Sequence, residues 1–181
     1  MKIIAMIPAR YDSSRFPGKL MQDLGGKSVI LRTYQATIGT NLFSDVYVVT
    51  DSEIISEEIK SHGGKVFMSQ KTHESGSDRI AEAAEAIDCD LVVNVQGDEP
   101  FIPSENITLV ASLIDETSLS MSTLCSKINS AQEVLEPNNV KVIFDKNNKA
   151  IYFSRSVIPF CRDQVIKEGV ILPFDYYRHI G

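Results

Sequence analysis

Short apolar runs alternate with segments of helical spacing over the first 124 residues of this chain. The runs are rich in β-branched residues, as in DVYVVT at 45–50, and several helical segments begin at a residue that can cap a helix. Strands are predicted at Lys2–Pro8, Asp45–Thr50, Lys65–Met68, Asp90–Val95 and Ser118–Leu124. Repeated strand–helix units favour an α/β fold, with a mostly parallel, doubly wound sheet and helices on both of its faces.

Helices are predicted between these strands at Ser28–Gly39, at Glu53–His62 after a cap at Asp51 or Ser52, from a cap at Ser77 or Asp78 to Ile87, and at Pro103–Glu116. After residue 124 the pattern changes to two strands that are close in sequence, Val140–Phe144 and Ala150–Phe153. The connecting segment DKNNK contains adjacent asparagines, which tolerate positive φ. An antiparallel hairpin is therefore predicted in addition to the parallel sheet.

Composition bounds the function. The length of 181 residues suits one domain, and the net charge of −6 argues against general nucleic-acid binding. The three cysteines are far apart and odd in number, which is typical of a reducing cytoplasm. The apolar run at the start is too short for a signal peptide, and no run approaches the roughly 20 residues of a membrane span. A cytoplasmic protein that binds neither nucleic acid nor membrane is expected.

The segment MIPARYDSSRFPGKLM at 6–21 carries a local cluster of cations and hydroxyls directly after the first predicted strand. The candidate anion-binding residues are Arg10, Ser13, Ser14, Arg15 and Lys19. A strand that ends in such a loop presents backbone N–H groups and cations to an anion, and a polyphosphate fits that chemistry. A solvated basic surface loop is the alternative interpretation.

A second strand end carries carboxylates. In VVNVQGDEP at 92–100, an apolar strand ends at Gln96, and Asp98 follows Gly97. The carboxyl ends of parallel strands share one edge of a sheet, so Asp98 is expected near the cationic loop. A carboxylate facing a polyphosphate is a natural ligand for Mg²⁺. The alternative is that Asp98 and Glu99 only cap the turn before Pro100.

Three further segments carry polar chemistry with less specificity. Ser75-Gly76-Ser77 leads into a helix N-terminus, which can bind a base edge or a phosphate, although helix capping alone explains Ser77 and Asp78. Arg155 follows the hairpin and can grip a carboxylate with two hydrogen bonds, or can be solvated or paired. His179 in YYRHIG can bind a sugar hydroxyl or a carboxylate, or can be an ordinary strand residue.

Together these segments resemble the cytidylyltransferases that activate sugar acids, most closely those acting on 3-deoxy-manno-octulosonate. The motifs IPARYDSSRFPGK, HESGSDRIAE, VVNVQGDEPFI, NNVKVIF, YFSRSVIPF and YYRHIG occur in the order and at the spacings of that family. The resemblance implies a Rossmann-like nucleotidyltransferase fold. It also implies a reaction in which CTP and the sugar acid give the CMP-sugar and pyrophosphate, with Mg²⁺, in lipopolysaccharide synthesis. Members are usually cytoplasmic homodimers.

The resemblance also implies roles for individual residues. The loop that holds the CTP triphosphate is matched by Arg10, Ser13 and Lys19, with Ser14 and Arg15 close by, and the segment near the cytosine is matched by Ser75, Gly76 and Asp78. The nucleotide and metal positions are matched by Gln96 and Asp98. The positions that hold the sugar acid are matched by Arg155 and His179. Arg10, Lys19 and Asp98 are the expected catalytic residues, and no residue is predicted as a general base.

The end of the chain is unusual for this family. The family places a second metal-binding aspartate and further dimer contacts beyond the position of Gly181. We therefore expect a single domain, 1–181, that lacks its C-terminal part, and a homodimer in the full-length protein. Two alternatives are another nucleotidyltransferase, such as the CMP-sialic acid synthetase type, and, for the fragment, a non-catalytic nucleotide-binding domain.

Overall fold

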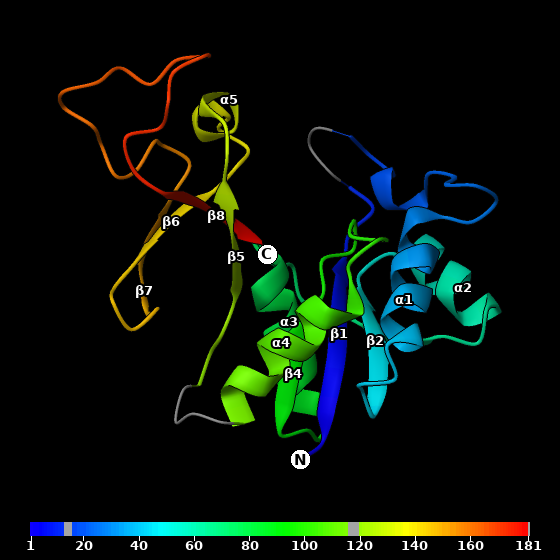
Figure 1. The fold of residues 1–181 in the computed structure, drawn as a ribbon. Coiled ribbons are helices and arrows are strands. Elements are labelled where there is room, and N and C mark those ends of the chain that lie inside the picture. Colours follow the sequence, from blue (N-terminus) through cyan, green and yellow to red (C-terminus); the bar gives the residue numbers. More distant parts are fainter. Residues whose placement is uncertain (13–15, 116–119, 181) are drawn as a thin grey trace. The chain divides into compact units, whose positions relative to one another are not determined.

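The computed structural model describes residues 1–12, 16–115 and 120–180 of the chain. The chain divides into two compact units, Met1–Glu116 and Thr117–Gly181, and each contains a four-stranded sheet of its own (Figure 1). Within the described residues, no helix has both the length and the apolar character that a membrane crossing requires.

The sheet of the first unit is parallel, as predicted. Its strands are β1 (Ile3–Ala9), β2 (Asp45–Thr50), β3 (Lys65–Met68) and β4 (Leu91–Asn94), in the order β3-β2-β1-β4. The first strand, β1, lies between β2 and β4, and all three run in the same direction. The chain adds β2 and β3 on one side of β1 and then returns to place β4 on the other side, so the strand order reverses between β1 and β4. Ligands of α/β sheets bind outside the carboxyl ends of the strands at such a switch point.

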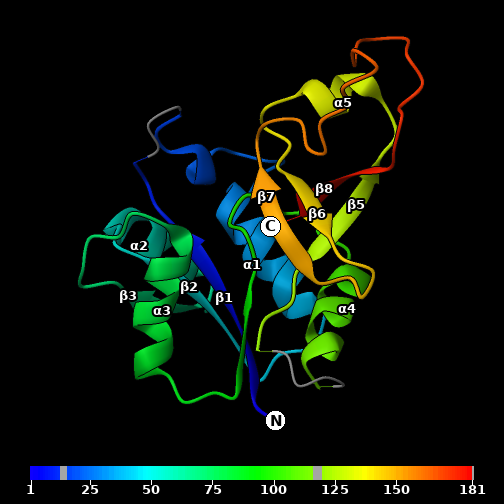
Figure 2. The ribbon, with the colours of Figure 1, turned by 90° about the vertical axis from the view of Figure 1, so that its left-hand side faces the viewer.

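Helices cover both faces of this sheet, as predicted. They are α1 (Val29–Gly39), α2 (Glu53–Ser61), α3 (Gly76–Ala86) and α4 (Ser104–Asp115). Alternate residues of β1 point to opposite faces: Ala5 and Ile7 share a buried cluster with residues of α1, α2 and α4, whereas Ile4 and Met6 pack with α3. Figure 2 shows α1 and α3 on opposite sides of β1.

Hydroxyl side chains begin the helices. Ser28 and Ser52 accept hydrogen bonds from Leu31 N and Ile55 N at the starts of α1 and α2, as expected. The cap predicted for α3 at Ser77 or Asp78 is wrong. Ser75 is the N-cap, because its hydroxyl accepts from Asp78 N while the Asp78 carboxylate accepts from Ser75 N in a reciprocal capping box.

The second unit is built on an antiparallel sheet. Its strands are β5 (Leu124–Ile128), β6 (Lys141–Phe144), β7 (Ala150–Ser154) and β8 (Tyr176–Ile180), in the order β5-β8-β6-β7. The predicted hairpin is confirmed as β6 and β7, and Asn148 in its turn has φ 61°. The hairpin belongs to this separate sheet, because β8 pairs with both β5 and β6.

One local prediction in this part of the chain is corrected, and one short helix was not predicted. The strand predicted at Ser118–Leu124 meets β5 only at Leu124, and residues 118 and 119 lie outside the described residues. Pairing with β8, which is distant in sequence, decides where β5 lies. The short helix α5 (Ala131–Leu135) was not predicted; Ser130 caps it, and Val134 packs in a small core with Ile128 and Tyr176.

Candidate functional site

A cation and a carboxylate meet at the carboxyl edge of the parallel sheet. The Lys19 ammonium donates a hydrogen bond to Asp98 Oδ2 and forms an ion pair with it. Lys19 lies in the loop after β1 and Asp98 in the turn after β4, so the sheet topology brings them together as expected. Both side chains are about half exposed, at 50% and 43%, so each can also reach a ligand that enters from solvent.

A left-handed turn sets the position of Lys19. Gly18 adopts φ 70°, which favours glycine, and a single turn of 3₁₀ helix, η1 (Lys19–Met21), starts directly after it. Gly18 N donates to Tyr11 O at 2.9 Å and closes the loop. The predicted residues Ser13, Ser14 and Arg15 belong to this loop but lie outside the described residues.

Close packing sets the position of Asp98. The preceding Gly97 is buried, and a Cβ atom there would lie 3.0 Å from Pro8 O and 3.3 Å from Leu20 Cδ1. Its carbonyl accepts a buried hydrogen bond from Thr33 Oγ1 of α1 at 2.9 Å. A side chain at position 97 would therefore push the turn away from β1, so glycine is needed for this close approach. Gln96, predicted as a nucleotide residue, is half-buried beside it.

The start of α3 also reaches the end of β1. A Cβ atom on Gly76 would lie 3.2 Å from Pro8 Cγ, so the helix N-terminus packs on the residues that precede the cationic loop. The hydroxyl of Ser75 and the carboxylate of Asp78 take part in the capping box. Capping thus uses the side chains of Asp78 and of Ser75, the latter in place of the predicted Ser77.

A polar cavity of about 500 Å³ adjoins Arg10. It is lined by Arg10, Tyr11, Asp12, Asp51, Ser52, Ile54, Thr72, His73 and Arg79. The Arg79 side chain is only 6% exposed; its Nη2 donates to Asp51 Oδ2 at 2.7 Å, while its buried Nη1 has no hydrogen-bond partner among the described residues. The hydrogen bond from Arg79 holds the pKa of the Asp51 carboxyl below its usual value.

Sequence reasoning missed this pair as a site feature. Asp51 was considered only as a helix cap, although it directly follows β2 and so lies at the same sheet edge as the cationic loop. Arg79 stands in the first turns of α3 and is buried against that edge. A buried guanidinium with a free donor beside Arg10 can hold a polar acceptor group of a ligand.

A second buried pair holds the segment that precedes α3. His73 Nε2 donates to Glu82 Oε2 at 2.6 Å, and both side chains are 9% exposed. Glu82 also accepts from Ser69 Oγ and from Gln70 N. These hydrogen bonds lower the pKa of Glu82 from 4.5 to about 2, with Ser69 the largest contributor and His73 next. Glu82 therefore ties the segment from β3 to Ser75 onto α3.

The two predicted sugar-acid residues lie in the second unit. Arg155 follows β7, is exposed, and donates from Nη1 to Pro137 O at 3.0 Å. His179 lies in β8, where its Nε2 is within hydrogen-bond distance of Thr123 Oγ1, at 2.7 Å. Its ring packs edge-to-face against Phe153, with 5.0 Å between the ring centroids. Burial lowers the pKa of His179, so its ring is neutral at neutral pH.

The described residues contain no group of three or more His, Cys, Asp or Glu side chains that could hold a metal ion. A metal held through Asp98 at this sheet edge would therefore also need oxygens of a bound ligand and water. Mg²⁺ is commonly held in this way, by one or two carboxylates plus phosphate oxygens.

A parallel α/β sheet with a cation and a carboxylate at its switch point is typical of a nucleotide-binding protein. The comparisons with known proteins specify the class. The cytidylyltransferase family matches residues 4–181. The chain belongs to this cytidylyltransferase family, and it is an enzyme of the nucleotidyltransferase class.

Relatives with assigned names are similar in sequence to nearly the whole chain. It is 55% identical to a 3-deoxy-manno-octulosonate cytidylyltransferase of Flavobacterium johnsoniae, over 100% of this chain and 73% of the relative. It is 50% identical to the enzyme of the same name from Christiangramia forsetii, over 99% of this chain and 71% of the relative. A solved structure of CMP:2-keto-3-deoxy-manno-octonic acid synthetase complexed with CTP is 36% identical, with a TM-score of 0.89, and covers 100% of this chain and 72% of its own.

Glu82→Gln is expected to lower the free energy of unfolding at neutral pH, because an amide replaces an ionised acceptor of three hydrogen bonds. The folded-state pKa of about 2 lies below the ordinary value of 4.5, so the carboxylate stabilises the protein fully above pH 4.5 and loses this effect as pH falls toward 2. The difference between wild type and variant should therefore shrink across that range. Urea unfolding at several pH values measures it.

Glu85→Gln, at an exposed position of the same helix, is the matched control and should change stability little at any pH. A difference between wild type and Glu82→Gln that stays constant down to about pH 3 would contradict the assignment.

Proposed function

We propose that the chain transfers CMP from CTP to 3-deoxy-manno-octulosonate and releases pyrophosphate, in the synthesis of lipopolysaccharide. The Lys19–Asp98 ion pair at the edge between β1 and β4 carries this proposal, because it joins a phosphate-binding cation to a metal-binding carboxylate. Relatives with this named activity at 55% and 50% identity support the choice of substrate. The neighbouring structure with bound CTP supports the choice of nucleotide.

The reaction needs charge neutralisation and alignment more than covalent chemistry. The anomeric hydroxyl of the sugar acid attacks the α-phosphorus of CTP, a new P–O bond forms, and the bond to pyrophosphate breaks. Lys19 and Arg10 stabilise the charge that grows on the leaving group, and Arg155 and His179 hold the sugar acid. In the free enzyme Lys19 binds Asp98, so CTP replaces that partner with phosphate oxygens.

Mg²⁺ is part of the proposal, and Asp98 is the described residue that would hold it. The fit rests on its carboxylate being half exposed, at the end of a strand, with an ammonium as its partner. When bound, Mg²⁺ neutralises phosphate charge and lowers the pKa of a coordinated hydroxyl. The protein itself contributes the fixed position of Asp98, through the close contacts of Gly97.

The reaction is tested by pyrophosphate release from the protein expressed from its own gene. Release is expected with CTP and 3-deoxy-manno-octulosonate in the presence of Mg²⁺. Sialic acid in place of this sugar acid, and UTP in place of CTP, should give much slower release. Faster release with sialic acid would assign the enzyme to the CMP-sialic acid synthetase type. CTP binding without any release would favour a nucleotide-binding domain.

A cytoplasmic homodimer is also proposed, on the basis of the family resemblance and the cysteine content. Light scattering on the same protein is expected to give twice the mass of one chain. A monomeric mass at micromolar concentration would contradict the dimer.

Asp98→Asn keeps the shape of the side chain and removes its charge. We expect turnover to fall about 100-fold or more, which is about 3 kcal/mol in the barrier. The matched control is Glu99→Gln, which removes the neighbouring exposed carboxylate and should leave turnover nearly unchanged. Steady-state kinetics at saturating Mg²⁺ measures both variants, and near-normal turnover of Asp98→Asn would end the metal assignment.

Lys19→Ala distinguishes a catalytic role of Lys19 from a role in attracting the anionic substrate. If Lys19 neutralises charge that develops on pyrophosphate, turnover should fall about tenfold or more, and by a larger factor than CTP binding weakens. If Lys19 only attracts anions, KM for CTP rises in a salt-sensitive way and turnover is unchanged. Kinetics at two ionic strengths distinguishes these outcomes, with Lys27→Ala as the control at an exposed lysine of the next loop.

A further inference from the structure

The second unit contains a fully buried lysine. Lys141, the first residue of β6, is 0% exposed, and its Nζ donates to Asn139 O at 2.7 Å and to Glu136 O at 3.1 Å. None of the ion pairs among the described residues involves it. Burying an ammonium against neutral carbonyls costs free energy that a neutral donor would not cost. A role for the charge itself is therefore indicated.

The segment that Lys141 binds, residues 136–140, contacts both predicted sugar-acid residues. Arg155 Nη1 donates to Pro137 O at 3.0 Å. The backbone N–H of His179 donates to Val140 O at 2.8 Å. Asn139 Nδ2 donates to Glu133 O at 2.9 Å, which fastens the same segment to α5. Segment 136–140 is thus a shared support for Arg155 and His179.

Strand register places Lys141 between the two residues that precede Arg155 and His179 in sequence. The strand β6 lies between β8 and β7, and Lys141 pairs with Arg178 on one side and with Ser154 on the other. Arg155 and His179 are the next residues after those two partners. A shift of Lys141 would therefore move its strand partners Ser154 and Arg178, and with them the adjoining residues Arg155 and His179.

Electrostatics gives the buried charge a second effect. Burial lowers the pKa of Lys141; the charge of Glu136 opposes this, and the nearby charge of Arg155 adds to it. The charges of Lys141 and Arg155 are therefore close enough to repel each other measurably. Segment 136–140 therefore lies against two cations, and its own Glu136 carboxylate partly offsets their charge.

We propose that Lys141 is a positioning residue for the sugar acid: its buried ammonium fixes segment 136–140, which in turn holds Arg155 and His179 in place for the substrate carboxylate and hydroxyls. This inference rests on the proposed function, because that function assigns Arg155 and His179 to the sugar acid. Lys141 does not touch the substrate itself.

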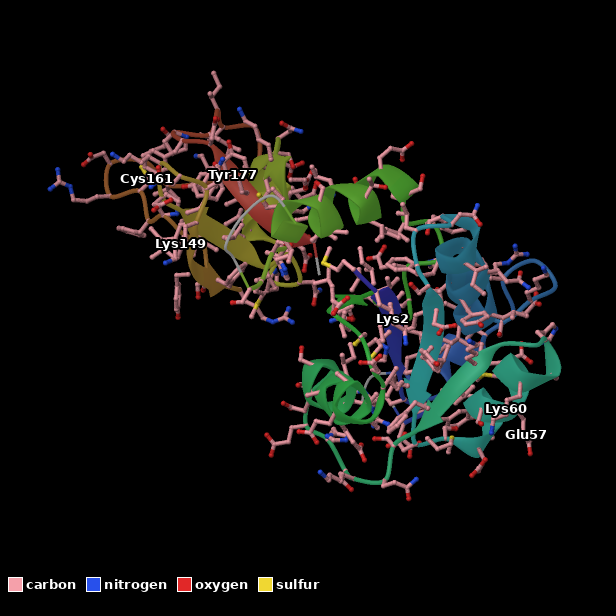
Figure 3. All side chains as sticks on the ribbon, turned by 90° about the horizontal axis from the view of Figure 1, so that it is seen from below. Lys2, Glu57, Lys60, Lys149, Cys161 and Tyr177 are labelled. Carbon is pink, nitrogen blue, oxygen red and sulfur yellow. The ribbon has the colours of Figure 1, made fainter. Side chains whose placement is uncertain are left out.

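Lys141→Met tests the proposal, because it keeps the aliphatic stem and removes the ammonium. We expect KM for 3-deoxy-manno-octulosonate to rise about tenfold or more, while KM for CTP stays within about twofold. Lys141→Gln keeps a neutral donor and should give an intermediate rise. Lys149→Met is the control: Lys149 is an exposed lysine in the hairpin turn (Figure 3) and should leave both constants unchanged.

A merely structural lysine would behave differently. It would lower the midpoint of thermal unfolding and either leave both KM values unchanged or raise both together, and each of these kinetic results overturns the proposal. If Lys141→Met does not fold, Lys141→Gln carries the comparison, and an unchanged KM for the sugar acid in that variant overturns it.

Amide exchange separates this inference from the proposed function. If the wild type releases no pyrophosphate from CTP with this sugar acid, the proposed function fails. Exchange of the His179 amide, measured by NMR, then decides the positioning role, because that N–H depends on Val140 O. Faster exchange in Lys141→Met than in Lys149→Met is expected, and equal rates overturn the inference.

Discussion

The pairing of β1 with strands on both of its sides determines the rest of the first unit. Because β2 and β4 run parallel to it, the loops after all three strands open at one edge of the sheet. The alternate faces of β1 are buried under different helices, so a slip by one residue would move Ile4 and Ala5 into each other's clusters and disturb the packing on both faces. This fixed strand places the cationic loop after Ala9 opposite the turn that carries Asp98.

Much of this arrangement could be predicted from local sequence. Strand β2 and the hairpin of β6 and β7 have strong β-branched or turn signals, and their positions were predicted to within one residue. The meeting of Lys19 with Asp98 also followed, because the topology of parallel strands brings their carboxyl ends together. The roles of these residues in catalysis stay predictions.

Other features depend on partners that are distant in sequence. The position of β5 depends on its pairing with β8, about fifty residues later in the sequence. The local residue pattern at 118–124 therefore predicted the strand in the wrong place. The pair Arg79–Asp51 has no local signature, because it joins α3 to the loop after β2, 28 residues earlier. Lys141 is similar: in the sequence NNVKVIF nothing marks a lysine as buried, and only the fold reveals it.

The two lysines show how one side-chain type serves two purposes. Lys19 is half exposed and pairs with a carboxylate in contact with solvent, where an ion pair contributes little free energy and so can exchange partners when phosphate arrives. Lys141 is enclosed and bonded to backbone carbonyls, which cannot leave without moving the segment itself. An exchangeable partner suits a residue that meets changing charge during a reaction. Fixed carbonyl partners suit a residue that has to keep other side chains in place.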